Sequence, residues 1–166
     1  MPRASMALDL PDGSATEALG RSLGRALPAA MRDASGAGAV LYLHGELGAG
    51  KTTCVRSLLR ALSVAGTVRS PTYTLVETYV VPALTCAHVD LYRLQTPAEV
   101  EELGLRDLAG PGCLMLVEWP ERGGAALPAA DLELWLSYAG EARRAEVRPR
   151  TLLGVEWLDN LDTTLA

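Results

Sequence analysis

Residues Gly45-Glu46-Leu47-Gly48-Ala49-Gly50-Lys51-Thr52 fit the pattern G-x-x-x-x-G-K-[ST] of a phosphate-binding loop, or P-loop. The run before this loop, residues 39–43, is short and apolar and predicts a buried strand. The run after it, residues 53–62, places leucine and valine at helical spacing. In a strand–loop–helix arrangement the loop N–H groups face one anion. The positive end of the helix, about half an elementary charge, is directed at the same point.

Lys51 is the only lysine in the chain, because the other fourteen basic residues are all arginine. Because the chain uses arginine everywhere else, the lysine indicates that this position needs a compact ammonium and not a planar guanidinium. Thr52 would offer its hydroxyl to a Mg²⁺ ion that bridges two phosphates. A chance match to this pattern arises in roughly one chain in a few hundred, so nucleotide binding is the stronger interpretation. We expect the phosphates to contact Leu47, Gly48, Ala49, Gly50, Lys51, Thr52 and Thr53.

The composition limits the classes of protein to which this chain can belong. A chain of 166 residues with 49% hydrophobic and 21% charged residues is typical of one folded domain that buries roughly 70% of its unfolded surface. The net charge of −5 argues against whole-molecule binding to nucleic acid, although a local basic patch stays possible. Cys54, Cys86 and Cys113 show no paired spacing and are expected to be buried thiols. No run is long enough for a membrane helix and no signal pattern opens the chain, so we expect a cytoplasmic location and no membrane partner.

The order of the predicted elements indicates an α/β fold. Further strands are expected within residues 70–81 and at 84–90, 113–117, 131–138 and 145–148. Further helices are expected from a capping box at residues 14–17 to near Pro28, and at residues 98–103. We therefore predict a P-loop NTPase-like sheet with a parallel core, antiparallel additions and helices on both faces. Residues 1–13 are expected to be a loose leader, 14–150 a single P-loop ATPase domain, and 151–166 a tail that is either a short helix or disordered.

Two carboxylates follow predicted buried strands, at the sheet edge where ligands collect in such folds. Glu118 ends the apolar run at 113–117, and a charge beside a buried strand is costly without a partner. We therefore assign Glu118 to the metal together with Thr52. Asp90 could support the metal or orient a water molecule, or it could be a solvated carboxylate at a strand end.

The sequence alone leaves alternative roles for several other polar residues. The hydroxyl-rich stretch at residues 70–72 could approach the terminal phosphate as a switch, or could be an ordinary proline turn. His44 and His88 alternate with apolar residues and are interpreted as structural. Arg143 and Arg144 could reach a phosphate or a base, but arginine pairs in turns are usually solvated.

Four blocks in this order resemble the TsaE (YjeE) family of small bacterial ATPases. They are the loop with Thr53, the run Ser70-Pro71-Thr72-Tyr73-Thr74-Leu75-Val76, the run His88-Val89-Asp90-Leu91-Tyr92-Arg93-Leu94, and the run Leu116-Val117-Glu118-Trp119-Pro120-Glu121-Arg122. Glu102-Leu103-Gly104-Leu105 is also similar to the family, and the resemblance spans about residues 14–147. Members are required to form threonylcarbamoyladenosine at position 37 of tRNAs that read codons beginning with A.

The resemblance implies ATP and Mg²⁺ as cofactors and the TsaD and TsaB proteins as partners. It implies that Lys51, Asp90 and Glu118 are catalytic, that Thr52 and Glu118 bind the metal, that residues 70–72 are switch-like, and that Trp119 lies beside the site. It also places Arg143 near the nucleotide and the base near Asp12 and Gly13. ATP hydrolysis is expected to be slow alone and activated by the partners, resetting the TsaD–TsaB complex between turnovers, with no primary role for direct tRNA binding.

Two other functions compete with this one. A P-loop small-molecule kinase would transfer phosphate to an added acceptor, but the sequence contains no second basic cluster to bind such an acceptor. A nucleotide-dependent binding module would hydrolyse ATP only incidentally, and partner binding would then survive the change Glu118→Ala when ATP is present.

Overall fold

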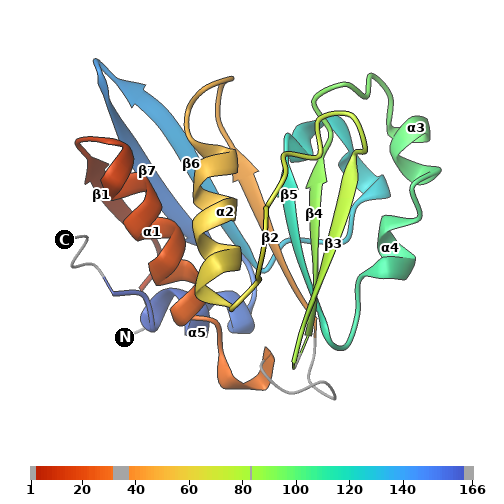
Figure 1. Ribbon diagram of the computed structural model, residues 1–166, viewed down its shortest axis with the longest axis horizontal. Helices are drawn as coiled ribbons and strands as arrows, with labels where there is room; N and C mark the ends of the chain where they lie inside the picture. Colours follow the sequence, from red (N-terminus) through yellow and green to blue (C-terminus); the bar gives the residue numbers. More distant parts are fainter. Residues whose placement is uncertain (1–2, 32–37, 83, 163–166) are drawn as a thin grey trace.

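Seven strands form one mixed sheet in the computed structural model, which describes residues 3–31, 38–82 and 84–162. The strands lie in the order β1-β7-β6-β2-β5-β4-β3 (Figure 1). Their bounds are β1 Met6–Leu10, β2 Ala39–His44, β3 Val76–Val81, β4 Leu84–Asp90, β5 Cys113–Glu118, β6 Leu132–Ala139 and β7 Ala142–Pro149. Strands β6, β2, β5 and β4 are mutually parallel, whereas β1, β7 and β3 join antiparallel. The predicted parallel core with antiparallel additions is confirmed.

Helices cover both faces of this sheet, as predicted. The α-helices are α1 Gly13–Arg25, α2 Lys51–Ala61, α3 Pro97–Glu101, α4 Leu105–Leu108 and α5 Leu152–Asp159, and short 3₁₀ turns are η1 Ala29–Met31, η2 Pro120–Arg122 and η3 Gly124–Ala126. Strand β5 shows why both faces need covering: Leu114 and Leu116 pack in the core with α1, α2 and α5, and Met115 and Val117 pack in a second core with α3 and α4. Alternating side chains of a strand point to opposite faces, so a wholly apolar strand requires two apolar layers.

Helices α1 and α2 lie side by side on one face (Figure 1) and touch backbone to backbone. A Cβ atom on Gly20 would lie 2.3 Å from the Cys54 carbonyl oxygen, and one on Gly24 would lie 2.9 Å from the Leu58 carbonyl oxygen. Any larger residue at these two positions would force the helices apart. The contact fixes the start of α1 relative to the start of α2, and the functional site lies at these two starts.

The N-terminal prediction was wrong. Residues 6–10, expected as part of a loose leader, form strand β1, which pairs with β7 and buries Leu10 completely. Helix α1 then begins at Gly13, with the Asp12 side chain accepting from the Ala15 N–H, and not at the capping box predicted for residues 14–17. The strand escaped notice because its five residues include only three large apolar side chains, Met6, Leu8 and Leu10.

The C-terminal segment contains a helix, which was one of the two alternatives. Helix α5 begins after Thr151, whose hydroxyl accepts from the Gly154 N–H, and it buries Trp157 completely. The Trp157 indole N–H donates to the Leu23 carbonyl of α1 at 2.9 Å. The core therefore extends beyond the predicted limits of residues 14–150 at both ends. Residues 1–2 of the predicted leader and 163–166 of the predicted tail lie outside the described residues.

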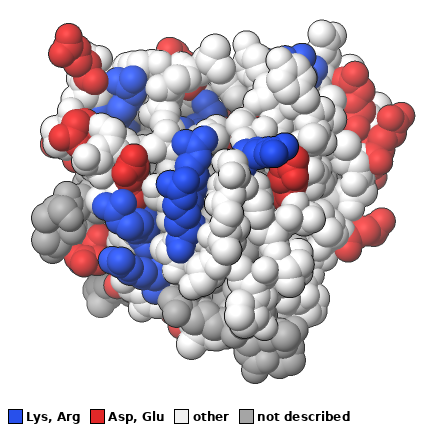
Figure 2. Space-filling view, in the orientation of Figure 1, with Lys and Arg blue, Asp and Glu red and all other residues white. Residues whose placement is uncertain are grey.

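Charge is unevenly distributed on this surface. Figure 2 shows basic side chains gathered over the centre of the face formed by α1 and α2, with acidic side chains mostly around the edges. These helices contribute Arg21, Arg25, Arg56 and Arg60. The three cysteines are buried as expected, and burial raises the pKa of Cys54 to about 12. Among the described residues, no helix is long and apolar enough to cross a membrane.

Candidate nucleotide site

The glycine-rich loop, residues 45–52, connects the carboxyl end of β2 to the start of α2. It turns at Gly45, Gly48 and Gly50, whose φ angles are +149°, +80° and +111°. A Cβ on Gly48 would also lie 2.7 Å from the Tyr138 hydroxyl, so both backbone angle and space require glycine there. Gly50 caps α2 without any side-chain hydrogen bond. The helix start therefore presents its positive end to the loop, as the sequence predicted.

Lys51 is the first residue of α2, and its side chain is folded back over the loop. The residue is only 4% exposed. Its Nζ atom donates to the carbonyl oxygens of Gly45 at 2.5 Å and Glu46 at 2.9 Å, and lies 4.2 Å from the centroid of the Trp119 ring. The ammonium is therefore held at the loop by backbone carbonyls and an aromatic face.

The electrostatic surroundings of Lys51 are mixed. Burial lowers its pKa, because a charged ammonium is disfavoured away from water. The carboxylates of Glu118, Glu121 and Asp90 act in the opposite direction, in that order of effect, and the net shift is downward. The site thus combines one buried cation with several carboxylates close enough to act on it.

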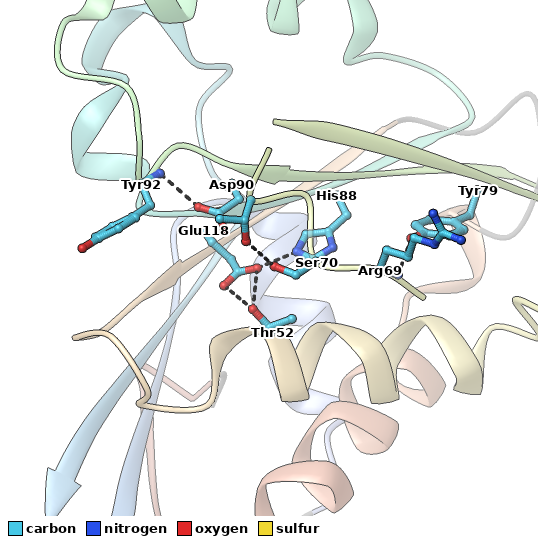
Figure 3. A network of polar contacts seen from close by, with 9 residues as sticks. Thr52, Arg69, Ser70, Tyr79, His88, Asp90, Tyr92 and Glu118 are labelled. Atoms are coloured by element: carbon cyan, nitrogen blue, oxygen red, sulfur yellow. Dashed lines mark hydrogen bonds and ion pairs between the residues drawn. The ribbon is translucent and has the colours of Figure 1, made fainter. Parts of the chain in front are cut away.

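Glu118 lies at the centre of a buried polar network, shown in Figure 3. The Thr52 hydroxyl donates to its two carboxylate oxygens at 2.9 and 3.1 Å. On the other side, His88 Nε2 lies 2.6 Å from Glu118 Oε2. His88 is completely buried and Glu118 is 2% exposed, and within the described part of the chain His88 Nδ1 has no hydrogen-bond partner. The structure therefore brings together Thr52 and Glu118, the two predicted metal ligands.

Asp90 ends β4 beside Glu118, because the two residues are register partners of the parallel pair β4–β5. Its Oδ1 atom accepts from the Tyr92 N–H at 3.0 Å. Burial, the largest influence, raises the pKa of Asp90; the hydrogen bond from Tyr92 lowers it, and the charge of Glu118 raises it further. Asp90 is therefore a buried carboxylate at the site and not a solvated strand end.

The predicted switch stretch lies against the same space. The hydroxyls of Ser70 and Thr72 are 2.8 Å apart. Both residues line a cavity of about 320 Å³, which we call the loop cavity. Its lining is Leu47, Gly48, Gly50, Lys51, Thr52, Thr53, Ser70, Thr72, Asp90, Tyr92, Glu118 and Trp119. Eight predicted catalytic, metal or phosphate-loop residues, from three separate parts of the chain, meet the switch stretch here.

Trp119 has a left-handed backbone conformation, with a φ of 59° that residues other than glycine seldom adopt. It follows Glu118 directly, so the chain turns sharply at the carboxyl end of β5. The turn places the ring over Lys51 and 5.0 Å from the Tyr92 ring, measured between centroids. Strained residues of this kind concentrate at functional sites.

A second cavity, of about 190 Å³, adjoins the first across the loop, and we call it the helix cavity. Gly13 at the start of α1 and Arg143 at the start of β7 line it, as do Gly48, Ala49, Gly50 and Thr53 of the loop and α2. Arg143 Nη2 lies 3.4 Å from the Gly48 carbonyl oxygen, and its guanidinium lies 4.1 Å from the Tyr138 ring centroid. Both outlying predicted residues, Gly13 and Arg143, therefore line a cavity beside the loop, and Arg143 contacts the loop directly.

Tyr138 contacts the glycine-rich loop, and the sequence did not predict this contact. Its hydroxyl donates to the Leu47 carbonyl at 2.6 Å, and no motif marks it. His88 was interpreted as structural, and it is indeed buried within β4, but it also contacts Glu118. Arg144 lines neither cavity, and its Nη1 atom lies 3.7 Å from the exposed Asp9 carboxylate, so it behaves as a solvated surface residue.

A metal ion at this site would need phosphate or water ligands in addition to protein side chains. Within residues 3–31, 38–82 and 84–162, no three histidine, cysteine, aspartate or glutamate side chains cluster so as to hold a metal ion by themselves. A hydroxyl and a carboxylate beside an anion-binding loop nevertheless suit Mg²⁺, which is usually held by one or two carboxylates plus phosphate and water. The donor set of Thr52 and Glu118 therefore fits a magnesium–phosphate complex.

The fold and the cavities define an α/β protein of the P-loop NTPase-like class. Comparisons with known proteins narrow this class. The profile of the family described as "Threonylcarbamoyl adenosine biosynthesis protein TsaE" matches residues 10–148, and the chain belongs to this family. It therefore takes part in the biosynthesis of threonylcarbamoyladenosine in tRNA.

Individual relatives agree with this assignment. The tRNA threonylcarbamoyladenosine biosynthesis protein TsaE of Haemophilus influenzae is 44% identical over 115 residues, which cover 69% of this chain and 73% of the relative. The TsaE protein of Nostoc is 38% identical over 146 residues, covering 84% and 83%. The crystal structure of Bacillus subtilis YdiB superposes with a TM-score of 0.72 over 93% of this chain and 92% of that one. At 23% identity, this last similarity shows the fold alone.

Proposed function

We propose that this protein is a Mg²⁺-dependent ATPase that supports threonylcarbamoyladenosine formation at tRNA position 37 by acting on the TsaD–TsaB complex. Membership of the TsaE family supports the pathway. The loop cavity supports the chemistry, because it joins an anion-binding loop to a buried ammonium and two carboxylates. Hydrolysis would be slow for the protein alone and faster with the partner proteins.

The observation that carries the proposal is the contact between Thr52 and Glu118. The hydroxyl lies 2.9 Å from the carboxylate at the point where the glycine-rich loop ends. These two side chains would hold Mg²⁺, which when bound neutralises charge on the phosphates. His88 would keep the Glu118 carboxylate oriented through Nε2.

The remaining residues would bind and orient the reactants. Lys51 would exchange its bonds to the Gly45 and Glu46 carbonyls for bonds to phosphate oxygens. Asp90 would accept a hydrogen bond from the attacking water, a task helped by a pKa raised through burial. Trp119 would shield the phosphates from solvent beside Lys51.

The helix cavity would hold the nucleoside part of ATP. It adjoins the phosphate loop through Gly48 and Gly50, and it contains Gly13 and Arg143. Arg143 supplies a planar cation whose face lies against Tyr138, an arrangement that could also stack on a base. Both cavities together then accommodate one nucleotide.

Release of phosphate from Mg²⁺–ATP tests this proposal. It should be measured for the protein alone and then with purified TsaD and TsaB. We expect slow turnover that rises with the partners and disappears in Lys51→Ala. Unchanged turnover, with no complex detected by size-exclusion chromatography, would contradict the action on TsaD–TsaB.

The same assay distinguishes the competing functions. Transfer of labelled phosphate to an added metabolite, and not to water, would identify a small-molecule kinase. A binding module would be indicated if Glu118→Ala abolished hydrolysis but left both ATP-dependent partner binding and threonylcarbamoyladenosine formation intact.

A further inference from the structure

A third cavity lies on the other side of the glycine-rich loop, at the carboxyl ends of β2 and β6. Its volume is about 550 Å³, and we call it the aromatic cavity. It is lined by His44, Gly45, Glu46, Glu121, Trp135, Leu136, Ser137 and Tyr138. None of these residues lines the loop cavity or the helix cavity. A ligand here would therefore leave the nucleotide site free.

The walls of this cavity are aromatic. Trp135 and Tyr138 are 38% and 46% exposed, and they are among the few large apolar side chains on the described surface. The His44 ring stacks on the Trp135 indole with centroids 3.7 Å apart and planes 4° apart. Stacking fixes the indole in place, so it offers a rigid surface at little cost in side-chain freedom.

Carboxylates surround this aromatic surface. Glu46 and Glu121 line the cavity, and Glu133 lies 3.7 Å from His44 Nε2. His44 Nε2 is itself buried and has no hydrogen-bond partner among the residues that the structure describes. An aromatic surface with a carboxylate rim is complementary to an organic cation.

Two arginines lie over aromatic rings of this cavity, and their hydrogen bonds go to other groups. Arg148 lies 5.0 Å from the Trp135 ring centroid, and both ends of its guanidinium bind the Glu146 carboxylate at 2.8 and 2.9 Å. Arg143 lies over Tyr138 and donates to the carbonyls of Glu141 and Ala142. Among the described residues, neither arginine forms a hydrogen bond or ion pair with Glu46 or Glu121, and Glu121 Oε2 lies 3.7 Å from His44 Nδ1.

The aromatic cavity is connected mechanically to the nucleotide loop. Tyr138 lines the cavity and donates to the Leu47 carbonyl at 2.6 Å. Gly45 and Glu46 also line it, and their carbonyls accept from Lys51 Nζ on the nucleotide side. Anything that presses on this cavity therefore acts directly on the backbone that positions Lys51.

We infer that the aromatic cavity receives an arginine side chain of the partner protein, and that its docking transmits partner binding to the nucleotide loop. This inference rests on the proposed function, since the partner is the TsaD–TsaB complex. Arginine fits better than lysine, because its planar fork can bind a carboxylate such as Glu46 or Glu121 through two hydrogen bonds. Arginine, tryptophan and tyrosine are enriched among the residues that dominate binding energy at protein interfaces.

The test compares Trp135→Ala with wild type in the full-length protein. We expect the Kd for TsaD–TsaB to weaken at least about tenfold, as for the loss of an interface hot spot. Activation of ATP hydrolysis over the variant's own basal rate should fall in parallel, while basal rate and ATP affinity stay unchanged. Glu121→Gln should weaken binding by a smaller factor without removing the aromatic surface.

Two variants on α5 serve as matched controls. Leu152→Ala removes a side chain that is 90% exposed, and Glu156→Gln removes an exposed carboxylate, both away from the aromatic cavity. Neither should alter the affinity for TsaD–TsaB. Circular dichroism of every variant checks that folding is intact.

Each outcome has a defined meaning. If wild type is activated by TsaD–TsaB and both cavity variants are activated equally, the inference is overturned and the proposed function stands. If Trp135→Ala instead abolishes self-association in sedimentation velocity without affecting partner binding, the occupant is a second copy and the inference is also overturned. If wild type is neither bound nor activated, the proposed function itself fails.

Discussion

His88 Nε2 and Glu118 Oε2 lie 2.6 Å apart, and neither residue has appreciable contact with solvent. The pair joins strands β4 and β5 behind the loop cavity, where the His88 backbone is register partner to Leu116. Two oxygens of one carboxylate thus face two different donors, His88 on one side and Thr52 on the other. Glu118 is held in one orientation without any contribution from bulk water.

Replacement of His88 should therefore affect Mg²⁺ use. His88→Leu removes the donor, and we expect the Mg²⁺ concentration for half-maximal ATP turnover to rise by about 10–100-fold, as for other residues that orient a metal ligand. His88→Gln can still donate an N–H and should restore most of the loss. Titration of Mg²⁺ at saturating ATP measures the effect. Equal behaviour of the two variants would show that His88 only fills space.

Thr52 and Thr53 should have separable roles. Thr52 contacts Glu118, whereas Thr53 lines both the loop cavity and the helix cavity. We expect Thr52→Val to abolish the increase in ATP affinity that Mg²⁺ provides. Thr53→Val should lower affinity by the same factor with and without the metal. Calorimetric titration with ATP, in Mg²⁺ and in EDTA, distinguishes them, and a metal-independent effect of Thr52→Val would exclude it as a ligand.

The ionised carboxylate of Asp90 should lower the free energy of unfolding, although it serves ATP hydrolysis. Burial raises its pKa above the ordinary value of 3.8, so the folded protein holds this proton more tightly than the unfolded chain. The free energy of unfolding therefore decreases as pH rises from 3.8 through the raised pKa, and the full cost is present above that raised pKa. Asp90→Asn keeps the acceptor for the Tyr92 N–H and avoids the buried charge.

We therefore expect Asp90→Asn to melt at a higher temperature than wild type at neutral pH and to hydrolyse ATP more slowly. The difference in melting temperature should shrink as the buffer is made acidic, because the wild-type carboxyl is then protonated too. Thermal melts across a pH series, without nucleotide, measure this. A difference independent of pH would mean that ionisation of Asp90 is not its cause.

Gly20 should be sensitive to the smallest enlargement. In Gly20→Ala the new methyl would meet the Cys54 carbonyl at 2.3 Å and the Ser57 Cβ at 2.8 Å. We expect a loss of about 1–3 kcal/mol in the free energy of unfolding, as for an overpacked core. Gly13→Ala is the matched control, since its added methyl meets nothing within 4 Å. Urea denaturation of both variants gives the comparison, and equal stabilities would contradict close helix packing.

The sequence predicted the centre of the fold better than its margins. Strands β2, β4 and β5 are buried on both faces and therefore consist of nearly continuous apolar runs that are easy to recognise. Strand β1 lies at the sheet edge and alternates between buried and exposed positions over only five residues. Its place depends on pairing with β7, at the far end of the chain, and no local pattern reveals that.

The residues of the candidate site likewise fall into those that local sequence predicts and those that it does not. Lys51 and Thr52 belong to one contiguous motif, and Glu118 follows a strand, so local sequence is sufficient to predict them. The contacts of His88 and Tyr138 arise from strand register and from the approach of β6 to the loop. Such contacts join residues far apart in the chain, and hydrophobic periodicity contains no information about them.

The backbone contact between α1 and α2 also has an entropic consequence for ligands. It holds the Gly13 wall of the helix cavity against the glycine-rich loop before anything binds. Residues 70–72, of which Ser70 and Thr72 line the loop cavity, lie outside any helix or strand. Ordering a backbone residue costs about 1–2 kcal/mol in conformational entropy. A compound confined to the helix cavity would avoid this cost, whereas one that reaches Ser70 and Thr72 would incur it, so the two ends of a nucleotide should differ in the temperature dependence of their binding.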